Sequence, residues 1–185
     1  GLNTLLINYN IILYLILILF FNQNFYDIGF LKYLVLTLLV LLFFNFNGKI
    51  ILGDSGSYLI SLFSGFLLIR FSNDNLAISP YFIVLLLWYP CYELLFSMIR
   101  RLKSKKTMYE PDVHHFHQVL FSFIEKKLEY SRNFNHLIVS TIINFYNLIL
   151  IIIGINFAYQ TKELIFILFV NIVVYSTVYF ALKRT

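Results

Sequence analysis

A short polar stretch interrupts the apolar runs of this sequence and carries the groups best suited to chemistry: Gly48-Lys49-Ile50-Ile51-Leu52-Gly53-Asp54-Ser55-Gly56-Ser57-Tyr58. Asp54 is a carboxylate between segments of membrane-spanning length, where ionisable residues are usually functional. Gly53 and Gly56 permit sharp turns and close approach of a ligand to the backbone. The Ser57 hydroxyl and the N–H groups at the start of the next helix can hold an anion. The stretch therefore predicts a metal and phosphate site at a membrane surface, or alternatively a polar turn in which Asp54 only caps a helix.

A second polar region, residues 100–135, holds eight of the fourteen basic residues: Arg100, Arg101, Lys103, Lys105, Lys106, Lys126, Lys127 and Arg132. Loops rich in Lys and Arg usually stay in the cytoplasm, so we expect this loop there. Arg100 and Arg101 directly follow an apolar run. They either anchor the topology at anionic headgroups or bind phosphates, and the sequence leaves both interpretations open.

Three of the four histidines, His114, His115 and His117, follow Asp112 in this loop. Asp112 is placed to cap a helix that Val113 begins. Histidines at the head of a helix can bind phosphate oxygens or move protons near neutral pH. One alternative is zinc shared by His114 and His117, although no third ligand stands at a suitable spacing. The other alternative is a purely structural role at the membrane interface.

Apolar side chains after these histidines fall on one face of the predicted helix: Phe116, Val119, Leu120, Phe123 and Leu128. Lys126 and Lys127 lie elsewhere on it, so the pattern predicts an amphipathic helix on or in the membrane interface. Upstream, Glu93 follows Pro90 by three residues near the end of an apolar run. We expect Glu93 to pair with the Arg100/Arg101 cluster or with another helix, rather than to act directly in catalysis.

The composition is that of a membrane protein, with 60% hydrophobic and 12% charged residues and a mean hydropathy of +0.80 over 185 residues. A single cysteine, Cys91, excludes a disulfide framework and a cysteine-based zinc site. We interpret the net charge of +5 by position, as a signal of membrane topology, and expect no nucleic-acid partner.

Six apolar runs are candidates for membrane spans: residues 4–21, 30–46, 57–71, 78–99, 136–159 and 163–182. The expected fold class is all-α, a polytopic transmembrane helix bundle of about six spans with an amphipathic interfacial helix in a cytoplasmic loop. Ser57, Ser61 and Gly65 recur at four-residue spacing and predict close packing of the third span. Counting spans back from the basic loop places the Gly53–Ser57 loop on the same cytoplasmic face.

Two motifs on this expected face resemble the polyprenyl-phosphate N-acetylhexosamine-1-phosphate transferase family, also called glycosyltransferase family 4. The stretch Ile51-Leu52-Gly53-Asp54-Ser55-Gly56-Ser57 is similar to the hydrophobic-Met-Gly-Asp-x-Gly-Ser loop of that family. Pro90-x-x-Glu93, Arg100-Arg101-Leu102-Lys103, Pro111-Asp112 and His115-x-His117 resemble its other cytoplasmic signature in order and spacing. The branch that uses UDP-N-acetylglucosamine fits better than the muramoyl-pentapeptide branch.

The resemblance implies transfer of a sugar-1-phosphate, with GlcNAc-1-phosphate favoured, from a UDP-N-acetylhexosamine to undecaprenyl phosphate, releasing UMP. Such a reaction opens cell-envelope polysaccharide synthesis, including that of lipopolysaccharide, at the bacterial inner membrane, with the active face cytoplasmic. It implies Mg²⁺, with Mn²⁺ as a substitute, bound by Asp54. Catalysis would fall to Asp54, His115 and His117, and substrate binding to further residues: Gly53, Gly56, Ser57, Arg100, Arg101, Asp112 and His114. A second copy of the chain, as a homodimer, is among the expected partners.

The resemblance covers essentially the whole chain but corresponds to the C-terminal half of that family. Gly1-Leu2-Asn3 looks like the residues that begin at the Gly of the family's Asn-x-x-Asp-Gly motif. We therefore expect residues 1–185 to form the C-terminal half of a membrane glycosyl-phosphotransferase domain, without turnover in isolation. The chain departs from the family pattern at Val113, where Arg is common, and at Gln118, which replaces a His. A polytopic transporter or channel is the alternative function, and it predicts coupling to an ion gradient.

Overall fold

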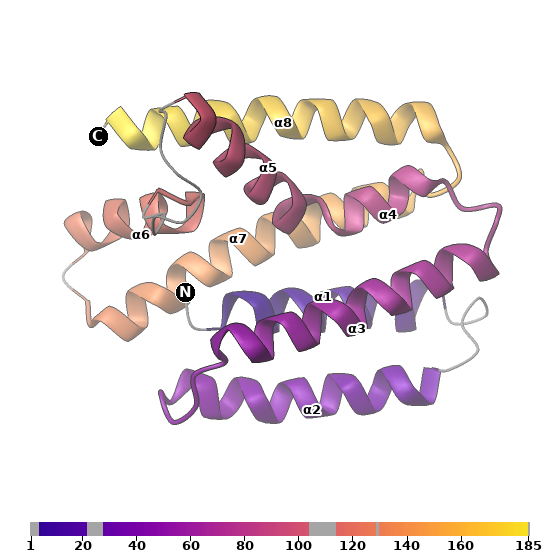
Figure 1. Ribbon diagram of the computed structural model, residues 1–185, viewed down its shortest axis with the longest axis horizontal. Coiled ribbons are helices and arrows are strands. Elements are labelled where there is room, and N and C mark those ends of the chain that lie inside the picture. Colours follow the sequence, from indigo (N-terminus) through magenta and orange to yellow (C-terminus); the bar gives the residue numbers. More distant parts are fainter. Residues whose placement is uncertain (1–3, 22–27, 104–113, 129, 185) are drawn as a thin grey trace.

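The computed structural model describes residues 4–21, 28–103, 114–128 and 130–184, and all regular structure in these ranges is helical. The helices are α1 (Leu5–Phe20), α2 (Ile28–Phe46), α3 (Gly53–Asp74), α4 (Pro80–Leu86), α5 (Trp88–Lys103), α6 (Phe116–Lys127), α7 (Arg132–Ile155) and α8 (Thr161–Arg184). Most run along one axis, as Figure 1 shows, with α5 crossing it obliquely. The expected all-α polytopic bundle is confirmed. An apolar medium favours this fold because a helix satisfies its own backbone hydrogen bonds.

Four of the described helices are long and apolar enough to cross a membrane, namely α2, α3, α7 and α8, and α4 with α5 gives a fifth span if the bent pair crosses as one. By length and composition the described residues therefore contain four or five candidate spans, where the sequence predicts about six. The difference lies in α1, whose 16 residues extend about 24 Å, less than the roughly 30 Å of a bilayer core.

Protein, rather than lipid, surrounds much of α1. Ile7, Leu13, Tyr14 and Leu17 are almost completely buried, and α1 packs against α2, α3 and α7. Its apolar run therefore has the composition of a span but mostly forms the core of the bundle. Hydropathy alone does not separate these two environments, because both favour the same side chains.

The expected fourth span is bent by 76° between α4 and α5. Pro90, in the first turn of α5, has no N–H with which to bind the carbonyl of Leu86, one helical turn earlier. The hydroxyl of Tyr9, on α1, donates to that carbonyl instead. A side chain from another helix thus stabilises the bend that Pro90 permits.

The packed face of α3 differs from the expected one. Ser61 is exposed, and a Cβ added at Gly65 would meet no atom within 4 Å. Ser64 is buried instead, where it donates to the side chain of Asn10 and lies 2.8 Å from the hydroxyl of Tyr14. Hydrogen bonds between polar side chains, rather than the small-residue stripe, therefore join α3 to α1.

The amphipathic character predicted for the segment after the histidines is confirmed in α6. Its buried residues, Leu120 and Ile124, pack with Val139 and Ile143 of α7, while Lys126 and Lys127 are exposed. The apolar face thus contacts protein, and Leu128 follows the helix in an extended conformation rather than continuing that face.

Gly154, on α7, is required for close packing against α4. A Cβ at this position would lie 2.1 Å from Cδ2 of Leu85, which is buried. We expect Gly154→Ala to lower the thermal unfolding temperature in detergent, because overpacking costs about 1–3 kcal/mol. Gly65→Ala is the matched control, since alanine there gains roughly 0.5–1 kcal/mol of helix stability and meets open space. Equal shifts in both variants would contradict this packing.

Candidate functional site

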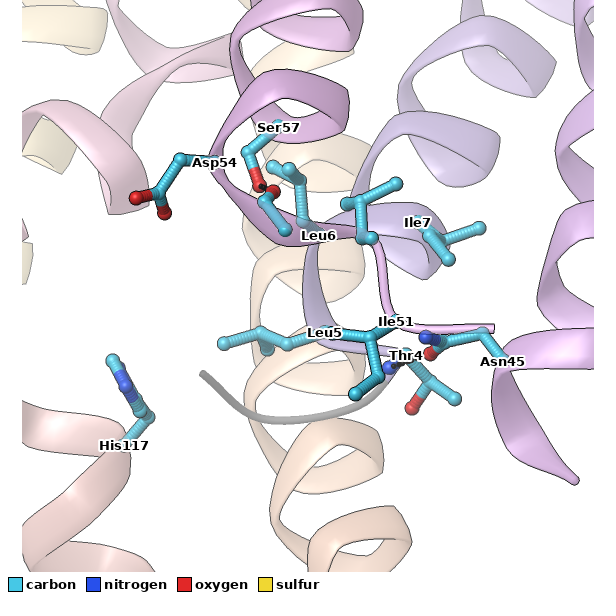
Figure 2. A pocket seen from close by; sticks show the side chains of 11 residues that line it. Thr4, Leu5, Leu6, Ile7, Asn45, Ile51, Asp54, Ser57 and His117 are labelled. Atoms are coloured by element: carbon cyan, nitrogen blue, oxygen red, sulfur yellow. Dashed lines mark hydrogen bonds between the residues drawn. The ribbon is translucent and has the colours of Figure 1, made fainter. Parts of the chain in front are cut away.

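A cavity of about 260 Å³ lies where the starts of α1, α3 and α6 meet. Its lining residues are Thr4, Leu5, Leu6, Ile7, Asn45, Ile51, Leu52, Gly53, Asp54, Ser57 and His117. Figure 2 shows Asp54 and His117 facing the same space, one from α3 and the other from α6. Two polar regions that are far apart in sequence therefore meet at one end of the bundle (Figure 1).

Asp54 enters the cavity from the first turn of α3. Gly53 begins this helix with φ of +64°, a left-handed conformation that favours glycine. Leu52, rather than Asp54, takes the N-cap position, and no side chain caps this helix by a hydrogen bond. Ser57 donates its hydroxyl hydrogen to the carbonyl of Gly53 at 2.7 Å. Asp54 is exposed, which leaves its carboxylate accessible to a ligand.

Gly56, predicted to bind substrate, is not among the lining residues. A Cβ added there would lie 2.8 Å from Cδ1 of Leu52. Since Leu52 does line the cavity, Gly56 acts through packing: it lets the Leu52 side chain lie against the first turn of α3.

Asn45, a residue that the sequence analysis missed, connects two walls of the cavity. It is 3% exposed. Its Oδ1 accepts from the N–H of Thr4 at 2.8 Å, and its Nδ2 donates to the carbonyl of Ile50 at 2.8 Å. Asn45 therefore fixes the start of α1 relative to the loop that leads to Gly53. The available signal was an amide in the last turn of an otherwise apolar helix.

Two residues of α7 complete the support for the start of α1. The hydroxyl of Thr4 donates to that of Ser140 at 3.1 Å, and Nδ2 of Asn144 donates to the carbonyl of Leu5 at 3.1 Å. The first-turn N–H groups of a helix have no acceptor within the helix, and the helix dipole makes this end positive. The start of α6 already has the Glu93 carboxylate as acceptor, so it is the starts of α1 and α3 that favour an anion beside the cavity.

The predicted start of α6 is corrected by the structure. The helix begins at Phe116, with His115 as its N-cap, and not at Val113. Oε1 of Gln118 accepts from the backbone N–H of His115 at 3.1 Å, so Gln118 supports the helix cap. Asp112 and Val113 lie outside the described residues.

His115 lies behind His117 rather than in the wall of the cavity. The two rings are parallel, with an interplanar angle of 6° and centroids 5.5 Å apart. Nδ1 of His115 lies 3.0 Å from Oε1 of the buried Glu93. The expectation that Glu93 pairs with another helix is confirmed, since it also accepts from Tyr175 of α8.

The other predicted binding residues do not line the cavity among the residues that the structure describes. Arg100 and Arg101 are half-buried in the last turn of α5. The carbonyl of His114 accepts from the hydroxyl of Tyr179 at 3.0 Å. Within the described ranges no three His, Cys, Asp or Glu residues are placed to hold a metal together.

The comparison with curated proteins gives one informative similarity. Over 80 residues the chain is 35% identical to an undecaprenyl-phosphate alpha-N-acetylglucosaminyl 1-phosphate transferase of Thermotoga maritima. The aligned region covers 43% of this chain and 26% of that relative, so the chain matches only about a quarter of the relative's length. No model of a known protein family matches the chain. No solved structure matches it either.

The role of Asn45 can be tested by hydrogen exchange. We expect Asn45→Ala to accelerate exchange in peptides that contain Thr4–Ile7 and Ile50–Ser57, because losing a buried hydrogen-bond partner costs about 1–3 kcal/mol. Mass spectrometry of the detergent-solubilised protein measures this change.

Asn47→Ala serves as the matched control, because Asn47 is exposed and its side chain donates to the carbonyl of Phe43, a local contact at the end of α2. Equal acceleration in the two variants would show that Asn45 does not join these walls.

Proposed function

We propose that this chain forms part of a membrane sugar-1-phosphate transferase that uses a UDP-N-acetylhexosamine and undecaprenyl phosphate. An oxygen of the lipid phosphate would attack the β-phosphorus of the UDP-sugar. One P–O bond of the new pyrophosphate would form as the bond to the bridging oxygen breaks, and UMP would leave with that oxygen. The similarity to the Thermotoga maritima transferase supports this reaction class. N-acetylglucosamine-1-phosphate is the group that we expect to be transferred.

The observation that carries the proposal is the meeting of Asp54 and His117 at one cavity beside the starts of α1 and α3. Phosphoryl transfer needs positioning and electrostatic stabilisation more than covalent chemistry from the protein. Helix starts favour phosphate oxygens, a carboxylate can bind a cation, and an imidazole can donate a hydrogen bond to a phosphate. A single cavity with all three features suits a nucleotide-sugar pyrophosphate.

Magnesium fits this cavity as an ion that substrate and protein share. Asp54 is the only carboxylate among the described lining residues, and Mg²⁺ commonly binds through one or two carboxylates together with waters and substrate phosphates. Bound there, the ion would offset the charge of the pyrophosphate. Mn²⁺ has similar oxygen preferences, and we expect it to substitute.

The two histidines, His115 and His117, would have different roles. We propose that His117 contacts the donor phosphates, since its ring lines the cavity. His115 would act by supporting that ring, because it lies between His117 and Glu93. Arg100 and Arg101 would attract both anionic substrates over a longer distance.

The membrane setting follows from the two substrates, one soluble and one a long lipid. The cavity lies at one end of the apolar bundle, so both could reach it at an interface. We propose that this end faces the cytoplasm of a bacterium across the inner membrane, consistent with the basic residues at the ends of α5, α6 and α8. The assignment of residues 1–185 to the C-terminal half of the domain, their lack of turnover in isolation, and the homodimer stay predictions.

Replacement of Asp54 tests the proposal directly. We expect Asp54→Asn to abolish Mg²⁺-dependent transfer of radiolabelled N-acetylglucosamine-1-phosphate to undecaprenyl phosphate, because the amide keeps the shape of the side chain but loses its charge. The assay uses membranes from cells that express the complete reading frame containing this chain. Chelation of the divalent cation should have the same effect, and added Mg²⁺ should reverse it.

Asp74→Asn provides the control on the same helix. Asp74 lies at the opposite end of α3, with its carboxylate 3.8 Å from Nε of Arg70, and it does not line the cavity. We expect this variant to keep its activity. Transfer by Asp54→Asn at the level of Asp74→Asn would remove Asp54 from the site.

A further inference from the structure

A buried carboxylate lies behind the histidines of the cavity. Glu93, on α5, is 8% exposed, and both of its oxygens accept hydrogen bonds. Oε1 accepts from the backbone N–H of Phe116 at 2.8 Å and lies 3.0 Å from Nδ1 of His115. Oε2 accepts from the hydroxyl of Tyr175. Three donors from two other segments satisfy this acid, and charge-assisted hydrogen bonds of this kind hold a side chain in one orientation.

The carboxylate determines which nitrogen of His115 carries hydrogen. An ionised carboxylate only accepts hydrogen bonds, so with Glu93 ionised the 3.0 Å contact requires Nδ1 of His115 as its donor. In the neutral ring Nε2 is then an acceptor. The backbone hydrogen bond from Phe116 to the same oxygen fixes Glu93 relative to the start of α6, and this relation keeps the His115 ring in one place.

The position of the His115 ring matters because His117 stacks on it. With parallel planes and centroids 5.5 Å apart, rotation of the inner ring would disturb the outer one. Only the outer ring lines the cavity with Asp54. Glu93 thus contacts His115, and His115 in turn stacks on His117, which lines the cavity.

The third partner, Tyr175, is itself held by packing. Its ring contacts those of Tyr92, Phe96 and Phe116, with centroid distances of 4.9, 5.3 and 4.9 Å. One turn later on α8, the hydroxyl of Tyr179 donates to the carbonyl of His114 at 3.0 Å. These tyrosines connect α8 to the histidine segment, one through Glu93 and the other through the backbone.

We propose that Glu93 is a positioning residue that keeps His115 in its Nδ1–H form and thereby orients His117 at the cavity, with Tyr175 holding Glu93. The effect on the histidines rests on the contacts of Glu93 described above and on an ionised Glu93 carboxylate. Its consequence for turnover rests on the proposed function, so the two are tested by separate measurements.

The first measurement is histidine-selective ¹⁵N NMR of the protein in detergent or nanodiscs. The chain has four histidines, so their two-bond ¹⁵N–¹H patterns can be assigned by single replacement. We expect the neutral ring of His115 to carry hydrogen on Nδ1 in the wild type. Hydrogen on Nε2 would overturn the proposal without the need for any variant.

Two replacements of Glu93 then test whether its effect on His115 depends on its hydrogen-bond acceptor or only on the shape of its side chain. Glu93→Met keeps a side chain of similar length but offers no comparable acceptor, so the Nε2–H form of His115 should appear. Glu93→Gln keeps an oxygen for Nδ1 and for the N–H of Phe116, so the Nδ1–H form should persist. His136, which stacks on Phe121, is the internal control and should not change.

The second measurement is steady-state kinetics with UDP-N-acetylglucosamine and undecaprenyl phosphate, in membranes from cells that express the complete reading frame containing this chain. We expect Glu93→Met to lower kcat by about 10- to 100-fold, as misplacement of a catalytic group does, with KM for the nucleotide sugar nearly unchanged. Glu93→Gln should restore most of the loss.

Tyr92→Phe is the matched control, because it removes a 3.1 Å contact with the Ser176 hydroxyl between the same helices, α5 and α8. It should alter neither the ¹⁵N–¹H NMR pattern of His115 nor kcat. An equal loss in Tyr92→Phe, or an unchanged His115 pattern in Glu93→Met, would overturn the proposal. A wild type without transferase activity would refute the proposed function and leave the NMR result to decide the role of Glu93.

Discussion

The need to give every buried backbone N–H and C=O group a hydrogen-bond partner constrains this structure more than any other feature, because an apolar medium cannot hydrate these groups. A helix that starts or bends inside an apolar bundle leaves N–H and C=O groups without partners, and each such group is costly if it stays unsatisfied. Here side chains from other helices supply the partners. Asn45 accepts from the N–H of Thr4 at the start of α1, and Glu93 accepts from that of Phe116 at the start of α6. Tyr9 donates to the carbonyl that Pro90 leaves without its usual donor.

The cavity is a consequence of these same contacts. Asn45 also binds the loop before Gly53, and Glu93 also binds His115. The residues that satisfy helix ends therefore place Asp54 and His117 on opposite sides of one space. Structural and chemical roles overlap in this region, and the side chains nearest to the cavity depend on partners that a ligand would not touch.

Much of this arrangement follows from sequence pattern. Apolar runs locate the helices within a few residues, and the charged loop indicates which ends belong together. Asp54 and His117 could be recognised as candidates because acids and histidines are rare in such a sequence. The withdrawal of His115 from the cavity could not be predicted, since neighbouring histidines at a helix start have the same composition but different directions.

Other features depend on tertiary contacts that hydropathy does not encode. Buried α1 and the longer apolar helices have the same composition, so hydropathy does not separate the shorter α1 from the four candidate spans of full length. The small-residue stripe of α3 matched a common packing pattern, but Ser64 offered a hydrogen bond to Asn10 that the exposed Ser61 does not make. The bend at Leu87 involves both Pro90 and the hydroxyl of Tyr9 on α1. Of these two residues only the proline is close to Leu87 in the sequence.

Because α1 is held by hydrogen bonds to α7, the first helix of the chain depends on contacts with a helix that is synthesised much later. Thr4 and Leu5 are held partly by Ser140 and Asn144, which are synthesised after Asp54 and His117. During translation both cavity side chains therefore exist before the wall at the start of α1 receives its last contacts. The contacts that hold this wall of the cavity are therefore complete only after α7 has been synthesised.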